Sequence, residues 1–353
     1  MDKRIEEHAK ILVDWSTEVK KGDMVAIVAS PLSHDLAVAV TKHVATRGGV
    51  PFTLMSSEEI RRAFFDGADD ETLGTEPTHV RAFIENCDAY IFIRSPMNTM
   101  ALANVDPNRM MLVNKANQDI QTIRLSKKWC LTVHPCATLA QQANMSLEEY
   151  QDFVYGATLV DWAAESKNMV LMKEHLEHHS DIRYVGPETD LYAKTEGRIW
   201  IASDGKHNMP SGEVFTAPVE DTVEGKIYFD IPFLQMGKVI EGVRLTFEKG
   251  EVIDYSAEKS GDTLKALIET DEGSKRLGEM AIGTNRGIKQ HTLNMLFDEK
   301  IGDTIHCALG RAYKECNGVN ESAVHVDMIK TMIDGEIIAG DEVIYSKGKY
   351  FFE

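Results

Sequence analysis

Cysteine is scarce in this sequence, with five among 353 residues and no Cys-x-x-Cys pair. An odd number of widely spaced cysteines does not build the disulfide framework of a small secreted domain. The N-terminal segment Met1 to His8 lacks the apolar stretch of a secretion signal. We therefore expect reduced thiols and a cytoplasmic protein. The cysteines are Cys87, Cys130, Cys136, Cys307 and Cys316.

Long apolar runs are missing as well, and basic residues are fewer than acidic ones. The longest apolar candidates, such as Met24 to Ala29, are far shorter than the roughly 18 to 20 residues of a membrane-spanning helix. The 38 Lys and Arg residues are outnumbered by 56 Asp and Glu, which gives a formal net charge of -18. This charge repels phosphate backbones, so we expect neither a membrane nor nucleic acid among the partners.

Several common catalytic motifs are absent. The pair Gly48-Gly49 lacks the G-x-G-x-x-G spacing of dinucleotide sites and is better interpreted as a cap at a helix end. Neither a Walker-type phosphate loop nor a G-x-S-x-G nucleophile elbow is present. His175 and His179 lie four residues apart on a predicted helix. A zincin helix needs a Glu directly after the first His or, in the inverted form, directly before the last, whereas Glu177 lies two residues from each. That cluster is better interpreted as a solvated helix end.

Helical and strand patterns divide the chain into two halves. In the first half, short apolar runs alternate with helical patterns, which is typical of an open α/β domain with a largely parallel sheet. From Asp181 onward, short β-like runs are separated by turns such as Lys249-Gly250, which predicts a strand-rich α+β domain. We expect an N-terminal α/β domain at residues 1–180 and a second, strand-rich domain at residues 181–353.

Two Gly-Glu pairs open apolar runs in the second half. Glu213 follows Gly212, and Glu279 follows Gly278. A buried strand rarely begins with an ionised Glu unless a cation or a hydrogen-bond donor compensates the charge. Glycine beside each Glu lets the backbone approach closely, which a crowded metal site can require. These two residues are therefore candidates for a common cation.

Two histidines and an aspartate lie in the strand patterns that follow. In the run from Thr304 to Gly310, alternation places His306 between small neighbours on one face. The two-residue spacing of His325 and Asp327 directs both side chains to the same side of a strand, which suits chelation. Taken singly, each of these residues is better interpreted as a hydrogen-bonded polar group of the core.

Together, the candidates supply two imidazoles and three carboxylates, a nitrogen and oxygen set that zinc, cobalt, manganese or iron accepts. Carboxylates gathered without cations repel one another, so we expect raised carboxyl pKa values in the metal-free site. The five candidate ligands are Glu213, Glu279, His306, His325 and Asp327.

These motifs make the sequence resemble the aminopeptidase T and aminopeptidase S family of dinuclear metallo-exopeptidases. The carriers, in the family's order, are Asn208 to Pro218, Glu269 to Glu279, Thr304 to Gly310 with Tyr313, and His325 to Asp327. The resemblance implies that the five candidates hold two divalent ions (zinc, cobalt, manganese or magnesium) and that Tyr313 and Glu279 act in catalysis. It also implies peptide substrates, release of N-terminal residues and a homodimer.

Such a site has a simple mechanism. Two ions a few Å apart would share a water and lower its pKa toward ~7, so that hydroxide attacks the peptide carbonyl. Tyr313 would donate a hydrogen bond to the resulting oxyanion, worth on the order of 3 kcal/mol. The general base stays open among Glu269, Glu272 and a metal-bound carboxylate.

Two other functions are compatible with the same residues. Ring-cleaving mononuclear iron dioxygenases resemble this family, and their two-His-one-carboxylate triad would be His306, His325 and Asp327. A single iron would leave Glu213 and Glu279 uncompensated at high cost, which favours the peptidase. The remaining alternative is a catalytically silent peptide-binding dimer, which would bind no metal tightly.

Overall fold

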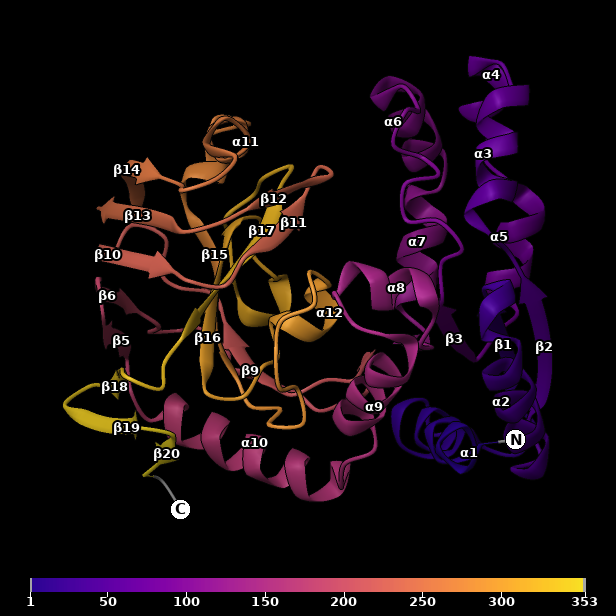
Figure 1. Cartoon of the computed structure of the whole chain (residues 1–353), viewed down its shortest axis with the longest axis horizontal. Coiled ribbons are helices and arrows are strands. Elements are labelled where there is room, and N and C mark those ends of the chain that lie inside the picture. Colours follow the sequence, from indigo (N-terminus) through magenta and orange to yellow (C-terminus); the bar gives the residue numbers. More distant parts are fainter. Residues whose placement is uncertain (1, 352–353) are drawn as a thin grey trace. The chain divides into compact units, whose positions relative to one another are not determined.

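A computed structural model describes residues 2–351, and its chain divides into two compact units (Figure 1). The first comprises residues 1–159 and 205–210, and the second comprises residues 160–204 and 211–353. The first is an α/β unit and the second is rich in antiparallel strands, which confirms the predicted fold class. The division into an N-terminal α/β domain at residues 1–180 and a catalytic metal-binding domain at residues 181–353 stays a prediction.

The first unit is built on a parallel sheet with the strand order β2-β1-β3-β4-β8. Its central strands are the continuous apolar runs of the sequence, and Ile27 and Ile91 are fully buried. The last strand, β8, comes from the segment that returns to this unit after the second unit has begun. The strands are β1 Met24–Ala29, β2 Val50–Met55, β3 Ala89–Arg94, β4 Lys128–Val133 and β8 Asn208–Met209.

Helices connect the strands of the first unit, and their ends follow local sequence signals. At the start of α9, Ser146 and Glu149 form a capping box, which satisfies two backbone N–H groups. Gly48 ends α2 with φ at 80°, a left-handed conformation that favours glycine. The helices are α1 Lys3–Lys10, α2 His34–Thr46, α3 Glu58–Gly67, α4 Asp70–Leu73, α5 Thr78–Glu85, α6 Pro107–Ala116, α7 Gln118–Leu125, α8 Ala137–Gln142 and α9 Leu147–Thr158.

The second unit contains a large antiparallel sheet with the order β14-β13-β10-β6-β5-β18-β19-β20. Turn glycines such as Gly250, with φ at 80°, separate its hairpin strands. The strands are β5 Asp181–Gly186, β6 Thr189–Lys194, β10 Glu224–Phe229, β13 Val243–Glu248, β14 Glu251–Ser256, β18 Glu336–Ala339, β19 Glu342–Ser346 and β20 Lys349–Tyr350.

A second antiparallel sheet in this unit has the order β17-β16-β15-β9-β7. One of its faces shares a hydrophobic core with the large sheet, in which Met280, Ile282 and Cys307 meet Tyr184 and Phe229. The strands are β7 Ile201–Ser203, β9 Glu213–Thr216, β15 Leu277–Gly283, β16 Thr304–Gly310 and β17 His325–Thr331, with a separate hairpin of β11 Phe233–Gln235 and β12 Lys238–Ile240.

Three helices complete the second unit. The longest, α10, packs against β7 and β9 and adds Met169, Met172 and Leu176 to the core. The helices are α10 Trp162–Glu177, α11 Gly261–Ile268 and α12 Met295–Asp298. Within residues 2–351, none of the helices is both long enough and apolar enough to cross a membrane. All five cysteines are buried and none forms a disulfide.

Candidate metal centre

The candidate ligands lie on four neighbouring strands of the five-stranded sheet. Glu213 begins β9, Glu279 is on β15, His306 is on β16, and His325 and Asp327 are on β17. The strand register places Glu279, Ala308 and Asp327 in one row across the sheet. Paired residues of antiparallel strands point to the same face, and so do residues two apart along a strand.

The same register puts all five candidates on one face. Glu213 pairs with Gly283 and His325 pairs with Gly310, each an even number of positions from the central row. His306 pairs with Ala281, which also belongs to this face. The opposite face faces the hydrophobic core, so an apolar side and a polar side are separated by a single layer of backbone.

Small residues occupy the positions between the ligands. Ala281, Gly283, Ala308 and Gly310 share the polar face, so no large side chain fills the space above the sheet there. The strand β15 has a bulge between Leu277 and Glu279. A Cβ atom on the intervening Gly278 would overlap the carbonyl oxygens of Gly310 and Arg311, so this position requires glycine. The predicted reason for glycine beside Glu279 therefore holds.

Glu279 is shared by two groups of potential ligands. One group is Glu213, Glu279 and His306, and the other is Glu279, His325 and Asp327, with the ligand atoms of each group within 4.8 Å of one another. Oε1 of Glu279 lies 3.2 Å from Nε2 of His306, and Oε2 lies 3.4 Å from Nε2 of His325. Each carboxylate oxygen of Glu279 thus faces a different imidazole.

In each group, the histidine also lies near a second carboxylate. Oε2 of Glu213 lies 3.4 Å from Nε2 of His306, and Oδ1 of Asp327 lies 3.6 Å from Nε2 of His325. Glu213, Glu279 and His306 are between 1% and 6% exposed. Ionisable groups are buried at this density when they compensate one another or bind a metal.

In the metal-free site, the pKa of the Glu279 carboxyl shifts in the direction opposite to the one expected from the sequence. Burial raises the pKa of Asp327, as expected. Burial acts in the same direction on Glu279, but hydrogen bonds and charges from His306 and His325 outweigh it and lower the pKa of Glu279. For the two imidazoles, the neighbouring carboxylates outweigh burial and raise both pKa values. Imidazolium protons therefore supply the positive charge that metal binding would replace.

One candidate ligand, His325, is oriented by a neighbour on the far side of its ring. Nδ1 of His325 lies 2.7 Å from the carbonyl oxygen of Arg311 and donates a hydrogen bond to it, which leaves Nε2 to face Glu279 and Asp327. Such a contact fixes both the tautomer and the ring orientation of a metal ligand. The ring is also held by Tyr313, whose centroid lies 5.0 Å away in an edge-to-face arrangement.

Tyr313 lies at the rim of the candidate centre. Its ring contacts His325 and also Phe215, at a centroid distance of 5.7 Å, and 40% of the residue is exposed. Partial burial and the charges of Glu279 and Asp327 raise the pKa of its phenol. The hydroxyl therefore stays protonated at neutral pH and remains able to donate a hydrogen bond.

Two charged residues that are not among the candidates from the sequence, Lys300 and its partner Glu299, lie beside the candidate ligand Glu213. Lys300 is fully buried, with Nζ 3.5 Å from Oε1 of Glu213, and it also donates a hydrogen bond to Glu299. Burial alone would lower the pKa of Lys300, but Glu213 and Glu299 outweigh it and raise that pKa, so the amine is charged. The only sequence signal for these residues was a run of charged residues directly after the apolar Phe297.

Two of the carboxylates considered as general bases, Glu269 and Glu272, form ion pairs with nearby lysines. Glu269 is the C-cap of α11 and pairs with Lys265 at 3.9 Å. Glu272 pairs with Lys275 at 3.3 Å, and its side chain is 92% exposed. Neither belongs to the groups of potential ligands. Their surroundings are those of a solvated helix end.

The donor set of the centre matches a divalent metal. Buried imidazole nitrogens and carboxylate oxygens converge on one face, small residues leave room between them, and no thiolate takes part. The fold and this site define a metalloenzyme with nitrogen and oxygen ligands. By the match of residues 1–350 to its family model, the chain belongs to the family described as thermophilic metalloprotease (M29).

Curated relatives and solved structures agree with this assignment. The chain is 29% identical to aminopeptidase AmpS of Bacillus subtilis (strain 168), over 99% of this chain and 98% of the relative. It is 27% identical to aminopeptidase T of Thermus thermophilus, over 92% and 91% of the two chains. The resemblance drawn from the motifs is thus confirmed, and it extends over the first half of the chain as well.

The structures of two proteins share the fold. Wild-type AmpT from Thermus thermophilus superposes with a TM-score of 0.86 at 23% identity, covering 99% of each chain. A 2,5-dihydroxypyridine dioxygenase from Pseudomonas putida KT2440 superposes less closely, with a TM-score of 0.60 at 13% identity, over 98% and 96% of the chains. Family membership makes this chain a metal-dependent hydrolase of peptide bonds.

Proposed function

We propose that this metalloprotease is an aminopeptidase with a dinuclear centre, in which Glu279 would contribute a ligand atom to each of two divalent ion sites. The observation that carries the proposal is the position of Glu279, with one oxygen facing His306 and the other facing His325. In this arrangement Glu213 and His306 complete one ion site, and His325 and Asp327 complete the other. The names of the curated relatives support the exopeptidase activity.

When bound, the ions supply Lewis acidity and a water of lowered pKa. The protein holds five ligands on rigid, paired strands, so the donor atoms are positioned before substrate arrives. Tyr313, protonated and partly exposed at the rim, donates a hydrogen bond to the peptide carbonyl oxygen as it gains negative charge. Lys300 holds Glu213 in place and balances its charge from the buried side.

Glu299 is our candidate for the residue that moves protons. Its side chain is 17% exposed, it is paired with Lys300, and it belongs to neither group of potential ligands. A carboxylate that stays off the metal remains available to accept a proton from water and deliver it to the departing amine. Its negative charge contributes to the raised pKa values of Asp327 and Tyr313, and its partner Lys300 also lies 3.5 Å from Glu213.

We extend the proposal to a homodimer that works in the cytoplasm on peptides. The family resemblance supports this state, and so does the apolar edge strand β2, where Phe52 and Leu54 are 58% and 45% exposed. Light scattering coupled to size-exclusion chromatography tests it. A monomer at the concentrations used for activity assays would contradict this part of the proposal.

Metal stoichiometry combined with substrate hydrolysis tests the central claim. We expect two divalent ions per chain, hydrolysis of a leucyl anilide, loss of that activity with a chelator, and recovery when ions are added back. Acetylating the substrate amine should block cleavage, because an aminopeptidase acts at a free N-terminus. A single oxygen-sensitive iron, or equal cleavage of the acetylated substrate, would contradict the assignment.

A further inference from the structure

A second group of metal-ligand side chains lies at the C-terminal end of α10. His175 is in the last turn of the helix, and His179 follows directly after its end. Glu342, the first residue of β19, faces both imidazoles. The sequence predicts a solvated helix end here, because no glutamate directly follows His175 or directly precedes His179. The structure supplies the carboxylate from a distant segment.

We propose that His175, His179 and Glu342 bind one Zn²⁺ ion, separate from the peptidase centre. Oε2 of Glu342 lies 3.4 Å from Nε2 of His175 and 3.6 Å from Nε2 of His179. N–H···O hydrogen bonds are shorter, at about 2.7–3.2 Å. Two ligand atoms on a tetrahedral zinc, with bonds near 2.0–2.1 Å, lie about 3.3–3.4 Å apart. The separations therefore suit a shared cation better than direct hydrogen bonds.

The backbone around this site holds the three ligands in place. The strand that follows His179 is β5, which pairs with β18, and β18 in turn leads through a turn into β19. Gly340 lies in that turn with φ at 58°, and a Cβ atom there would be 2.9 Å from Nδ1 of His179. The turn thus packs on the Nδ1 side of the ring and leaves Nε2 to face Glu342.

The local charges favour a cation. The backbone carbonyls at the end of a helix carry partial negative charge, and His175 and His179 lie at that end of α10. Within residues 2–351, the ion-pair partners of Glu342 are these two histidines. No lysine or arginine of the described chain competes for this carboxylate. Two imidazoles and one carboxylate, with water in the fourth position, are a common ligand set for zinc.

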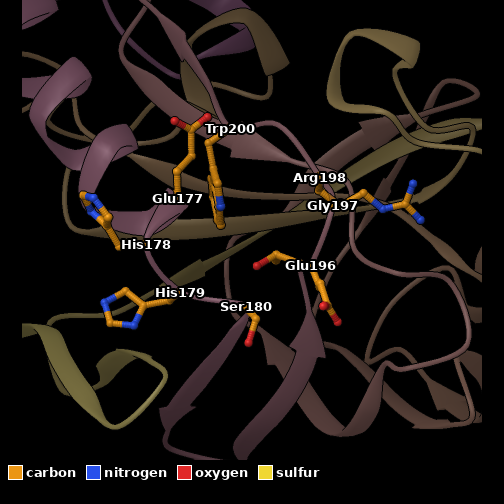
Figure 2. Close-up of a pocket in the computed structure, with 9 residues that line it drawn as sticks. Glu177, His178, His179, Ser180, Glu196, Gly197, Arg198 and Trp200 are labelled. Carbon is orange, nitrogen blue, oxygen red and sulfur yellow. The ribbon is translucent and has the colours of Figure 1, made fainter.

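The site lies beside a hollow of about 420 Å³ at the surface of the second unit, lined by His179, Ser180 and Arg198 among others. Figure 2 shows the His179 ring directed away from Ser180 and Arg198, out of the group of residues that line the hollow. His178, the next residue along the chain, also lines the hollow but belongs to no group of potential ligands. It therefore provides a matched control.

Zinc counting in the full-length enzyme tests the inference. After loading with Zn²⁺ and removal of free metal, we expect H175A/H179A to hold one zinc fewer per chain than the wild type, and H178A to hold the same number. E342Q should bind this zinc at least tenfold more weakly, measured by competition with a chromophoric chelator. Peptide hydrolysis should be retained in all of these variants, because the peptidase ligands are unchanged.

Equal zinc content and equal affinity in the wild type, E342Q and H175A/H179A would overturn the proposal. The same would follow if H178A lost the ion as well. If the double histidine variant does not fold, E342Q decides the outcome, because Glu342 has a half-exposed side chain and its substitution leaves the helix intact. This inference does not rest on the proposed function, so failure of the dinuclear centre in E279A would leave it standing.

Discussion

The buried amine of Lys300 lies 3.5 Å from the Glu213 carboxylate, on a side chain that is fully shielded from solvent. A charged lysine in such a place is stable only because Glu213 and Glu299 surround it. The charge of the candidate centre is therefore balanced partly by protein and not by metal alone.

Replacing this lysine should destabilise the metal-free enzyme. We expect Lys300→Met to lower the free energy of unfolding by about 3–5 kcal/mol, because two buried carboxylates lose their counterion. Urea denaturation of chelator-treated protein measures the change. Lys275→Met removes an exposed partner of Glu272 and should cost at most about 0.5 kcal/mol. Equal effects from both variants would mean that Lys300 is not compensating the centre.

Removing the shared carboxylate should disable both ion sites together. We expect Glu279→Ala to lose hydrolysis by a factor of about 100 or more while its circular dichroism spectrum is retained, since ligand contacts hold the catalytic ions. Metal content should fall from two ions toward none. Glu272→Ala, at an exposed position, serves as the control. Near-normal turnover by the Glu279 variant would show that the centre is misassigned.

The phenol of Tyr313 should affect turnover more than substrate binding. We expect Tyr313→Phe to lower kcat about 100-fold, the equivalent of roughly 3 kcal/mol, with little change in KM. Tyr255→Phe is a suitable comparison, because that hydroxyl contacts Glu269 and no candidate ligand. An effect confined to KM would assign Tyr313 to substrate binding instead.

Glu299 should reveal its role in the pH profile. If it accepts the proton from water, Glu299→Gln lowers kcat by about 100-fold and removes the acidic limb of the kcat profile. Metal content should be unchanged, because Glu299 is outside both groups of ligands. A profile of unaltered shape would contradict proton transfer by this residue.

The stability of the first unit should depend on pH through His8. Nε2 of His8 lies 2.8 Å from Oγ1 of Thr132, and that hydroxyl donates to the carbonyl of Met209, so the ring donates through Nε2. Burial, with a smaller contribution from His134, lowers the pKa of His8 to about 3. The folded state therefore favours the neutral form of His8. The stability that this provides is fully present above about pH 6.5, the pKa of histidine in the unfolded chain, and is lost as the pH falls below that value.

Unfolding experiments between pH 7.5 and 5 in the presence of chelator measure this effect. The wild type should lose about 1.4 kcal/mol per pH unit below pH 6 from this residue, and His8→Gln should lack that component. His207→Gln changes a histidine at an exposed position and is the control. Parallel pH curves for the wild type and His8→Gln would contradict the assignment.

The strands, and the strand face on which each of the five candidate residues lies, could be predicted because their signals are local. Apolar alternation around His306 and the His-x-Asp spacing each report which face a side chain takes, whatever the rest of the chain does. Gly278 is also a local signal, because a glycine directly before Glu279 indicates a close approach of the backbone at that position. The open question was whether these local faces converge, and the strand register places them in neighbouring rows.

Lys300, Glu299 and Glu342 could not be predicted, because their roles depend on contacts between distant segments. Lysine and glutamate are usually exposed, so a sequence gives no reason to bury Lys300. Glu342 meets His175 only because β18 pairs with β5, and long-range pairing is not encoded in residue spacing. The expectation for Glu279 erred similarly, since it counted carboxylate repulsion and omitted the two imidazolium neighbours.

The strand β8, which belongs to the first unit but follows part of the second in the sequence, limits which fragments of the chain can be produced. The carbonyl of His207 accepts a hydrogen bond from the amide of Leu131 at 2.7 Å, and the His207 ring stacks on Trp129. A fragment that stops at residue 160 would lack β8, so β4 would become an exposed edge strand with unpaired backbone donors and acceptors. Exposed edge strands pair with other chains and cause aggregation. Isolating the first unit in good yield will therefore require residues 205–210 to be grafted onto it.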